Sequence, residues 1–142
     1  MRTIALEEHF LTADLAHYSD ATRELAQPQV WREAATRLTD LAEQRLADMD
    51  RAGVDIAVLS LTAPGIQAEP DPRLAVARAA EVNDFLAGLV AANPARFRGF
   101  AALPLQNPKA AAKELQRAVE QLGLCGGLVN AHTGGVYLDA QP

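Results

Sequence analysis

The chain has 142 residues, of which 49% are hydrophobic and 22% charged, and its formal net charge is −5. This composition is typical of a soluble globular domain, and the acidic balance argues against nucleic acid or an anionic membrane as the main partner, because both require a basic surface. A single cysteine excludes an internal disulfide, and no apolar run reaches the ~20 residues that span a bilayer, so we predict a cytoplasmic protein.

Short apolar segments alternate with longer amphipathic ones along the chain. The short segments are residues 3–10, 55–61, 97–103 and 124–130. Segments of this length that are apolar on both faces are typical of buried parallel strands. We therefore predict four strands.

The amphipathic segments predict three helices. The apolar stripe of the first consists of Leu38, Leu41, Ala42, Met49 and Ala52. Gly53 can end this helix in a left-handed conformation. Asp71 and Asn107 are predicted N-caps of the other two helices, because each precedes a proline at the first helical position. These two helices are expected to end before Pro94 and at Gly123.

Residues 11–36 fit no simple strand or helix unit, with Pro28 interrupting them. We expect an irregular or partly helical insertion there, between the first strand and the first helix. No linker or low-complexity segment divides the chain, so residues 1–142 are predicted to form one domain.

The alternation of strands and helices predicts an α/β fold with a parallel sheet. Four parallel strands with intervening helices are the N-terminal half of a (β/α)₈ TIM barrel. A complete barrel typically needs ~250 residues. The chain is therefore expected to be a truncated part of a longer protein or, less favoured, one of two copies that complete each other.

The end of the first strand carries the most informative residues. Side chains alternate across a strand, which predicts Thr3, Ala5, Glu7 and His9 on one face and Ile4, Leu6, Glu8 and Phe10 on a second face that packs against helices. A carboxylate and an imidazole two residues apart can both ligate a divalent metal, and barrel active sites lie at this end of the strands. The spacing alone fits solvated residues equally well, and Glu8 is expected to form an ion pair or to support the other two.

Several segments resemble the amidohydrolase-related decarboxylases, a group that includes the γ-resorcylate, 2,3-dihydroxybenzoate and 5-carboxyvanillate decarboxylases. The sequence Ile-Ala-Leu-Glu-Glu-His-Phe of residues 4–10 resembles the opening of that family. Further resemblances follow in the family's order, at residues 45–55, 59–67, 83–86, 96–106 and 128–139. The resemblance thus spans essentially the whole chain.

The resemblance implies a role for four residues. Glu7 and His9 match the family's metal ligands on the first strand, for Zn²⁺ or Mn²⁺. Asn130 matches a polar group near the bound aromatic acid, and Thr62 is a second candidate for contact with substrate. No catalytic residue is expected in this chain, because the family's later histidines and its aspartate have no counterpart here.

The implied activity is metal-dependent, non-oxidative decarboxylation of a hydroxylated aromatic carboxylic acid by a homo-oligomeric enzyme, with this chain alone inactive. Two alternatives stay open. One is an amidohydrolase-type hydrolase of a lactone, ester or amide, and the other is a non-catalytic, truncated α/β binding protein. A nucleotide-binding fold is disfavoured, because no Gly-x-Gly-x-x-Gly follows the first strand.

Overall fold

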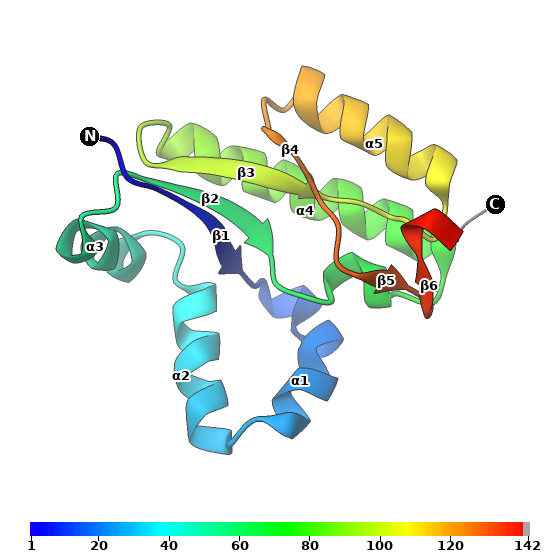
Figure 1. The fold of residues 1–142 in the computed structure, drawn as a ribbon, viewed down its shortest axis with the longest axis horizontal. Helices are drawn as coiled ribbons and strands as arrows, with labels where there is room; N and C mark the ends of the chain where they lie inside the picture. Colours follow the sequence, from blue (N-terminus) through cyan, green and yellow to red (C-terminus); the bar gives the residue numbers. More distant parts are fainter. Residues whose placement is uncertain (141–142) are drawn as a thin grey trace.

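A computed structural model describes residues 1–140 and places four parallel strands in one sheet (Figure 1). The strands are β1 (Ile4–Phe10), β2 (Ile56–Leu61), β3 (Phe97–Ala102) and β4 (Gly126–Leu128). They lie side by side in chain order, and every neighbouring pair is parallel. Each strand falls inside a predicted segment, so the predicted α/β sheet of four parallel strands is confirmed.

The fourth strand is shorter than predicted, because the backbone at both ends of residues 124–130 forms hydrogen bonds outside the sheet. The backbone N–H of Leu124 donates to Ala118 O at the end of a helix, and that of Asn130 donates to the side chain of Gln67. Only Gly126–Leu128 remain to pair with β3.

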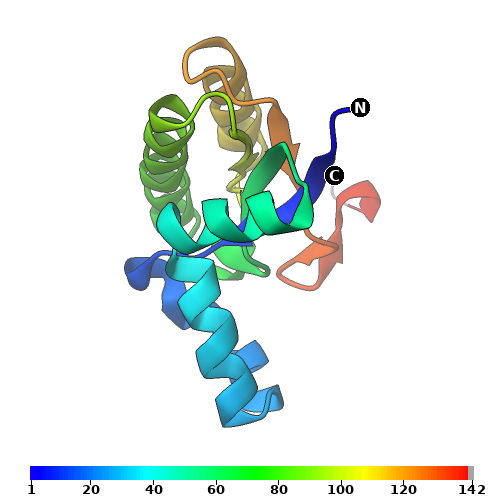
Figure 2. The same ribbon diagram turned by 90° about the vertical axis from the view of Figure 1, so that its left-hand side faces the viewer.

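Two long helices cover one face of the sheet (Figures 1 and 2). These are α4 (Pro72–Ala92) and α5 (Pro108–Glu120). The carboxylate of Asp71 accepts a hydrogen bond from Arg73 N at 2.8 Å, and Asn107 Oδ1 accepts one from Ala110 N at 3.1 Å. Both predicted N-caps are therefore confirmed. None of the helices within residues 1–140 combines the length and the apolar composition that a membrane span requires.

The prediction of a single first helix is wrong, because the structure has two helices there. The predicted apolar stripe is divided between α2 (Pro28–Thr39) and α3 (Glu43–Ala52). The break lies at Asp40, whose Oδ1 accepts hydrogen bonds from Ala42 N, Gln44 N and Arg45 N. Asp40 thus caps a new helix start instead of continuing the old helix. The predicted end at Gly53 is confirmed, since its φ is 68°.

The segment between β1 and α3 is more helical than the predicted insertion. It contains a 3₁₀ helix (Ala13–Ser19), α1 (Asp20–Leu25) and α2. Together α1 and α2 form an arm that projects away from the sheet (Figures 1 and 2). Neither of these two helices contains a fully buried residue. The core therefore lies elsewhere.

The core lies between the sheet and the two long helices. Ala57, Phe97 and Leu86 are each at most 1% exposed. A Cβ at Gly99 would come within 2.8 Å of Leu86 Cδ2, so the glycine allows α4 to approach β3 closely. The opposite, open face of β3 carries half-buried side chains, namely Arg98, Phe100 and Ala102.

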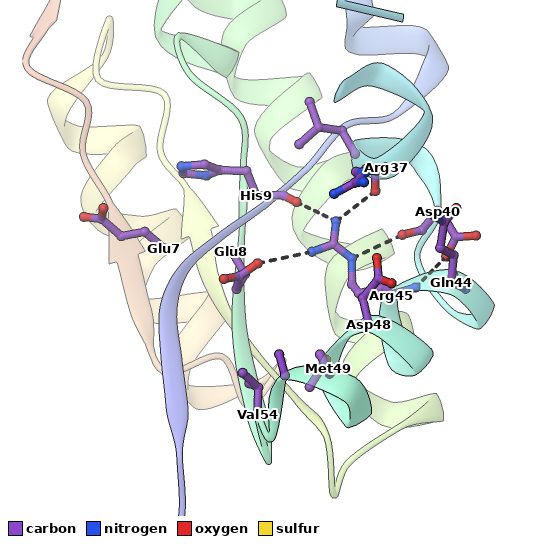
Figure 3. A pocket seen from close by; sticks show the side chains of 12 residues that line it. Glu7, Glu8, His9, Arg37, Asp40, Gln44, Arg45, Asp48, Met49 and Val54 are labelled. Atoms are coloured by element: carbon purple, nitrogen blue, oxygen red, sulfur yellow. Dashed lines mark hydrogen bonds and ion pairs between the residues drawn. The ribbon is translucent and has the colours of Figure 1, made fainter. Parts of the chain in front are cut away.

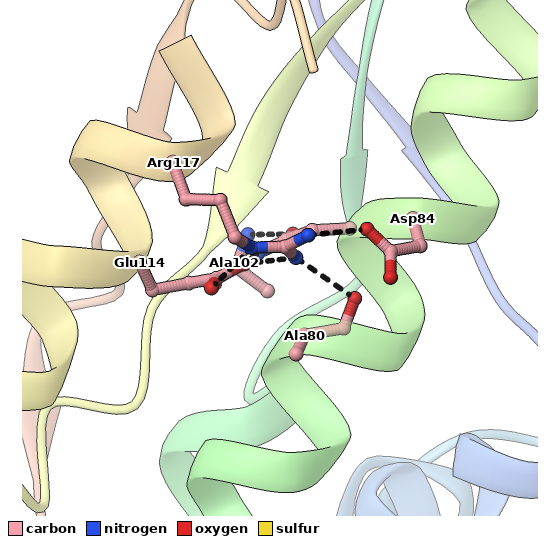
Figure 4. A network of polar contacts seen from close by, with 6 residues as sticks. Ala80, Asp84, Ala102, Glu114 and Arg117 are labelled. Atoms are coloured by element: carbon pink, nitrogen blue, oxygen red, sulfur yellow. Dashed lines mark hydrogen bonds and ion pairs between the residues drawn. The ribbon is translucent and has the colours of Figure 1, made fainter. Parts of the chain in front are cut away.

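A buried polar network fixes the carboxyl end of β3 to α4 and α5 (Figure 4). Asn83, which is 1% exposed, donates to Ala102 O at 2.9 Å and accepts from Ala102 N at 2.8 Å. Its amide also donates to Glu114, and Arg117 bridges Glu114 to Asp84. Because every member is hydrogen-bonded, the network fixes the level at which the strand ends relative to both helices.

The pairing of β1 with β2 contains one irregularity. Ala5 pairs with Ala57 and Glu8 pairs with Leu59, so two residues of β1 stand where β2 has one. An extra residue in one strand interrupts the alternation of side chains. Odd-numbered side chains of β1 therefore point to one face of the sheet before the bulge and to the other face after it.

Because of this bulge, the prediction of which β1 side chains face the helices is partly wrong. Ile4 is 52% exposed and Leu6 is 59% exposed, although both were expected to pack against helices. Ala5 lies on the helix face with its partner in β2, not on the face of His9. A shift of one residue moves side chains to the other face, and the sequence of β1 alone does not reveal such a shift.

Candidate metal centre

Glu7 and His9 lie at the carboxyl-terminal end of β1, with Glu7 in the bulge and His9 beyond it. Figure 3 shows both side chains extending to one side of the strand, while Glu8 extends to the other side toward Arg45. Glu7 is exposed and His9 is half-buried. Alternation from Glu7 to His9 thus leaves the two predicted ligands on a common side and separates Glu8 from them.

The imidazole of His9 is held by a serine of the neighbouring strand. His9 Nδ1 lies 3.0 Å from Ser60 Oγ, and Ser60 is 1% exposed. The other ring nitrogen, Nε2, has no hydrogen-bond partner within residues 1–140. A histidine that binds a metal through one nitrogen usually has its second nitrogen hydrogen-bonded in this way. With the carboxylate of Glu7 on the same side, the donor set fits a divalent metal that accepts nitrogen and oxygen.

The backbone of His9 is held from the opposite side by Arg45 of α3. Arg45 donates to His9 O at 2.7 Å, to Asp40 O at 3.1 Å and to Arg37 O at 3.3 Å. Its guanidinium lies 3.9 Å from the carboxylate of Glu8. Burial lowers the pKa of Arg45, and the negative charges of Glu8 and Asp40 oppose that shift. One cation therefore connects the end of β1 to the start of α3 (Figure 3).

A cavity of about 440 Å³ lies between β1 and α3, around Arg45. The side chains of Glu7 and His9 point away from Arg45 in Figure 3. Glu7 and His9 are thus at the border of this cavity, with their side chains directed away from its centre at Arg45, and we do not assign it to the metal centre.

Two donors do not complete a metal site. Stable zinc sites use four ligands, and catalytic ones use three from the protein. Among residues 1–140, no group of three or more His, Cys, Asp or Glu side chains is arranged to hold a metal ion. The described part of the chain thus supplies a pair of ligands and not a closed coordination shell.

The two predicted substrate contacts lie, like Glu7 and His9, at the carboxyl-terminal end of the strands. Thr62 directly follows β2, where its N–H donates to Phe10 O at 2.9 Å. Asn130 follows β4, and its Nδ2 donates to Pro64 O at 3.2 Å. Asn130 borders a cavity of about 10 Å³, which is room for about one water molecule. Because β1 and β4 are opposite edges of the sheet, the described residues do not bring Asn130 and the Glu7–His9 pair into one cavity.

Three residues of this region were not assigned from the sequence: Ser60, Arg45 and Gln67. Ser60 is a polar residue inside an otherwise apolar strand, which is a signal that could have been used. Gln67 is 8% exposed, and its amide donates to Asn130 O, His132 O and Thr133 Oγ1. Its partners are more than 60 residues away, so no local pattern points to them.

Comparisons with known proteins agree with the fold. The family described as "Amidohydrolase" matches residues 9–142, a span that includes His9 and begins two residues after Glu7. The γ-resorcylate decarboxylase of a Polaromonas species is 46% identical over 127 residues, which are 89% of this chain and 38% of that protein. The γ-resorcylate decarboxylase of Rhodococcus jostii is 43% identical over 136 residues, covering 96% of this chain and 40% of that protein. The chain thus spans about 40% of the length of these curated relatives.

Solved structures match over nearly the whole chain. A dihydroxybenzoic acid decarboxylase from Polaromonas, with bound manganese and the inhibitor 2-nitroresorcinol, has a TM-score of 0.85 and 45% identity, covering 92% of this chain and 39% of that one. A 5-carboxyvanillate decarboxylase from Novosphingobium aromaticivorans has a TM-score of 0.86 and 35% identity, covering 97% of this chain and 44% of that one. Its structure contains manganese and 3-methoxy-4-hydroxy-5-nitrobenzoic acid.

These matches confirm that the four parallel strands and their helices are the N-terminal part of a (β/α)₈ barrel. They also agree with the family resemblance of the separate sequence motifs. Both the sequence and the fold lead to one assignment: the chain belongs to the amidohydrolase family.

Proposed function

We propose that the chain is part of a metal-dependent, non-oxidative decarboxylase that acts on a hydroxylated aromatic carboxylic acid. The observation that carries this proposal is the Glu7–His9 pair, which extends to one side of β1 at its carboxyl end (Figure 3). The γ-resorcylate decarboxylases that match this chain at 43–46% identity support the same reaction class.

In this proposal Glu7 contributes a carboxylate oxygen and His9 contributes Nε2 to a divalent metal. When bound, the metal would supply a Lewis acid that orients and polarises the oxygens of the substrate. Manganese is the better supported ion, since two structural relatives contain it. Zinc is the alternative, because a mixed nitrogen and oxygen donor set accepts either.

Asn130 and Thr62 are the proposed contacts with the substrate, a small aromatic carboxylic acid. Pro64 O already holds the Nδ2 group of Asn130, so Oδ1 is the atom proposed to face the substrate. Thr62 is half-buried and would offer its hydroxyl beside the ends of β1 and β2. Both residues would orient the ring and neither would transfer a proton.

Residues 1–140 contain no group of three side chains that could hold a metal ion, and we assign no proton donor among them. We therefore expect the 142-residue chain alone to bind metal weakly and to be inactive. We also propose a cytoplasmic protein that forms homo-oligomers, which light scattering combined with size-exclusion chromatography would test.

A hydrolase of a lactone, ester or amide is the second candidate function, because the matching family is described as an amidohydrolase. The same ligand pair would serve that reaction. Decarboxylation is favoured, since the structural relatives at 35–45% identity are decarboxylases. A non-catalytic binding protein would retain the fold and bind no metal.

A chimera tests the proposal. Residues 1–142 are fused to the part of the Polaromonas relative that follows its matched segment, and the intact relative is the positive control. With Mn²⁺ and 2,6-dihydroxybenzoate, we expect release of carbon dioxide and resorcinol, and loss of both in the variant His9→Ala. Hydrolysis of lactones without release of carbon dioxide would favour the second candidate. A folded chimera in which His9→Ala retains full metal content would overturn the ligand assignment.

A further inference from the structure

Ser60 is an unusual residue for its place in the fold. It is 1% exposed in β2, whose six residues are all buried, and burying a hydroxyl without a hydrogen bond has a free-energy cost. Within residues 1–140, its hydroxyl has one hydrogen-bond partner, His9 Nδ1 at 3.0 Å. The side chain of a candidate metal ligand therefore satisfies this buried hydroxyl.

The strand register places this contact directly. His9 pairs with Ser60 in the parallel ladder, so their side chains lie side by side on the same face. The flanking residues Leu59 and Leu61 belong to the core on the helix face. A serine at this position therefore reaches the imidazole, whereas a serine one residue earlier or later would face the helices.

The backbone of His9 is already fixed, because Arg45 donates to its carbonyl oxygen at 2.7 Å. The remaining freedom of His9 is rotation of its side chain. A hydrogen bond to Nδ1 removes that freedom and leaves Nε2 as the nitrogen open to a ligand.

We propose that Ser60 is a positioning residue, which holds Nδ1 of His9 so that Nε2 is presented to the metal beside Glu7. This inference rests on the proposed function, since it takes His9 as a ligand. A hydroxyl can donate or accept. It can therefore keep the contact both when Nδ1 is unprotonated and when Nδ1 carries the proton because Nε2 binds the metal.

The proposal separates two roles for Ser60. If the serine only fills space in the strand, then Ser60→Ala leaves the imidazole and its metal affinity unchanged. If the hydroxyl positions the ring, then Ser60→Ala weakens metal binding and Ser60→Thr, which retains a hydroxyl, restores it.

The test uses the ¹⁵N-labelled chimera with the Polaromonas relative and Zn²⁺, which is diamagnetic, because the 142-residue chain alone supplies only two ligands. Long-range ¹H–¹⁵N correlation spectra follow the ring nitrogens of His9, whose signals are identified by their loss in His9→Ala. In the wild type we expect one hydrogen-bonded ring state without zinc and a zinc response at Nε2. In Ser60→Ala we expect exchange between tautomers and a Kd for zinc raised about 10–100-fold, the usual effect of removing a partner of a metal-ligating histidine. Circular dichroism monitors the fold of each variant.

The outcomes distinguish this inference from the proposed function. If His9→Ala has the zinc affinity of the wild type, or if the wild type binds no zinc at millimolar concentration, the ligand assignment fails. If His9→Ala loses zinc but Ser60→Ala binds it through Nε2 with unchanged Kd, only the role of Ser60 is wrong. Loss of affinity in both Ser60→Ala and Ser60→Thr, or zinc at Nδ1 in the wild type, would also overturn it.

Discussion

Two polar clusters at the carboxyl-terminal end of the sheet differ in how fully their side chains are hydrogen-bonded. The first cluster consists of Glu7, His9 and Ser60 at the ends of β1 and β2. The second consists of the side chains of Gln67 and Thr133 with the backbone of Asn130, in the loops that follow β2 and β4. Within residues 1–140, the carboxylate of Glu7 makes no hydrogen bond, and the ring of His9 makes one. Gln67, in contrast, uses both ends of its amide on Asn130, and donates to Thr133 as well.

This difference separates a candidate binding site from a structural cross-link. A buried polar group whose donors and acceptors are all paired fixes the segments that it joins, because leaving any of them unpaired has a cost. An oxygen and a nitrogen that lie on one side of a strand without partners are available to a ligand. Substitutions in the first cluster should therefore alter metal binding, and those in the second should alter stability.

The largest expected effect is that of Glu7→Gln on metal affinity. In the chimera with the Polaromonas relative, we expect the affinity for Mn²⁺ to fall by more than ~100-fold, beyond the ~10–100-fold that loss of a supporting residue causes. The glutamine keeps the size of the side chain and removes its charge, so the midpoint of urea unfolding should not change. Bound manganese is measured by electron paramagnetic resonance. Equal manganese content in wild type and variant would place Glu7 outside the metal centre.

A large effect on stability is expected for Gln67→Leu. The leucine has a similar volume but cannot bond to Asn130 or Thr133, which leaves the buried hydroxyl of Thr133 and the half-buried backbone N–H of Asn130 without this partner. At about 1–3 kcal/mol for a buried unsatisfied group, we expect the free energy of unfolding to fall by about 2–4 kcal/mol. Urea denaturation measures the change, and Thr133→Val, which removes one of these bonds, should lose less. A drop in zinc affinity without loss of stability would contradict the assignment of this cluster as structural.

A smaller, pH-dependent effect is expected for Tyr18→Phe. Tyr18 of the 3₁₀ helix Ala13–Ser19 donates a hydrogen bond to the buried carboxylate of Glu69, which also accepts from Asp71 N at 3.0 Å. The bond from Tyr18, with that from Asp71, lowers the pKa of Glu69. Burial, with the hydrogen bond to Glu69, raises the pKa of Tyr18 to about 12.

The signs of these shifts give two pH limits. The contribution of Glu69 is present above its ordinary pKa of about 4.3 and is lost as the pH falls through the lowered value. The contribution of Tyr18 is present below its ordinary pKa of about 10 and is lost as the pH rises toward 12. We expect Tyr18→Phe to lower the free energy of unfolding by about 1–2 kcal/mol at pH 7. The variant should also lose less stability than the wild type when the pH rises above 10. Unfolding free energies measured across pH would contradict this if the alkaline loss remained in the variant.

Local signals in the sequence determined much of the fold. Asp71 and Asn107 cap their helices through bonds to residues two or three positions away, and each strand lies within an apolar run, so both features could be predicted. The bulge in β1 depends on the register with β2, and the amide of Gln67 reaches residues 63–66 positions away. Such pairings depend on the folded chain and cannot be predicted from local patterns. Glu7 and His9 could be predicted on one side because side chains alternate from Glu7 to His9, whatever the register before them.

The smallest expected effect is that of Glu8→Gln, which is the matched control for Glu7→Gln. The two glutamates are neighbours in β1, but Glu8 extends toward Arg45 on the helix side (Figure 3). Its carboxylate lies 3.9 Å from the guanidinium, with 47% of the side chain exposed, so the pair should contribute less than about 1 kcal/mol. We expect the manganese affinity of the chimera to stay within about twofold of wild type, since Glu8 lies on the wrong side of the strand to reach the metal. If both glutamine variants lost manganese equally, the opposite facing of Glu7 and Glu8 at the end of β1 would be wrong.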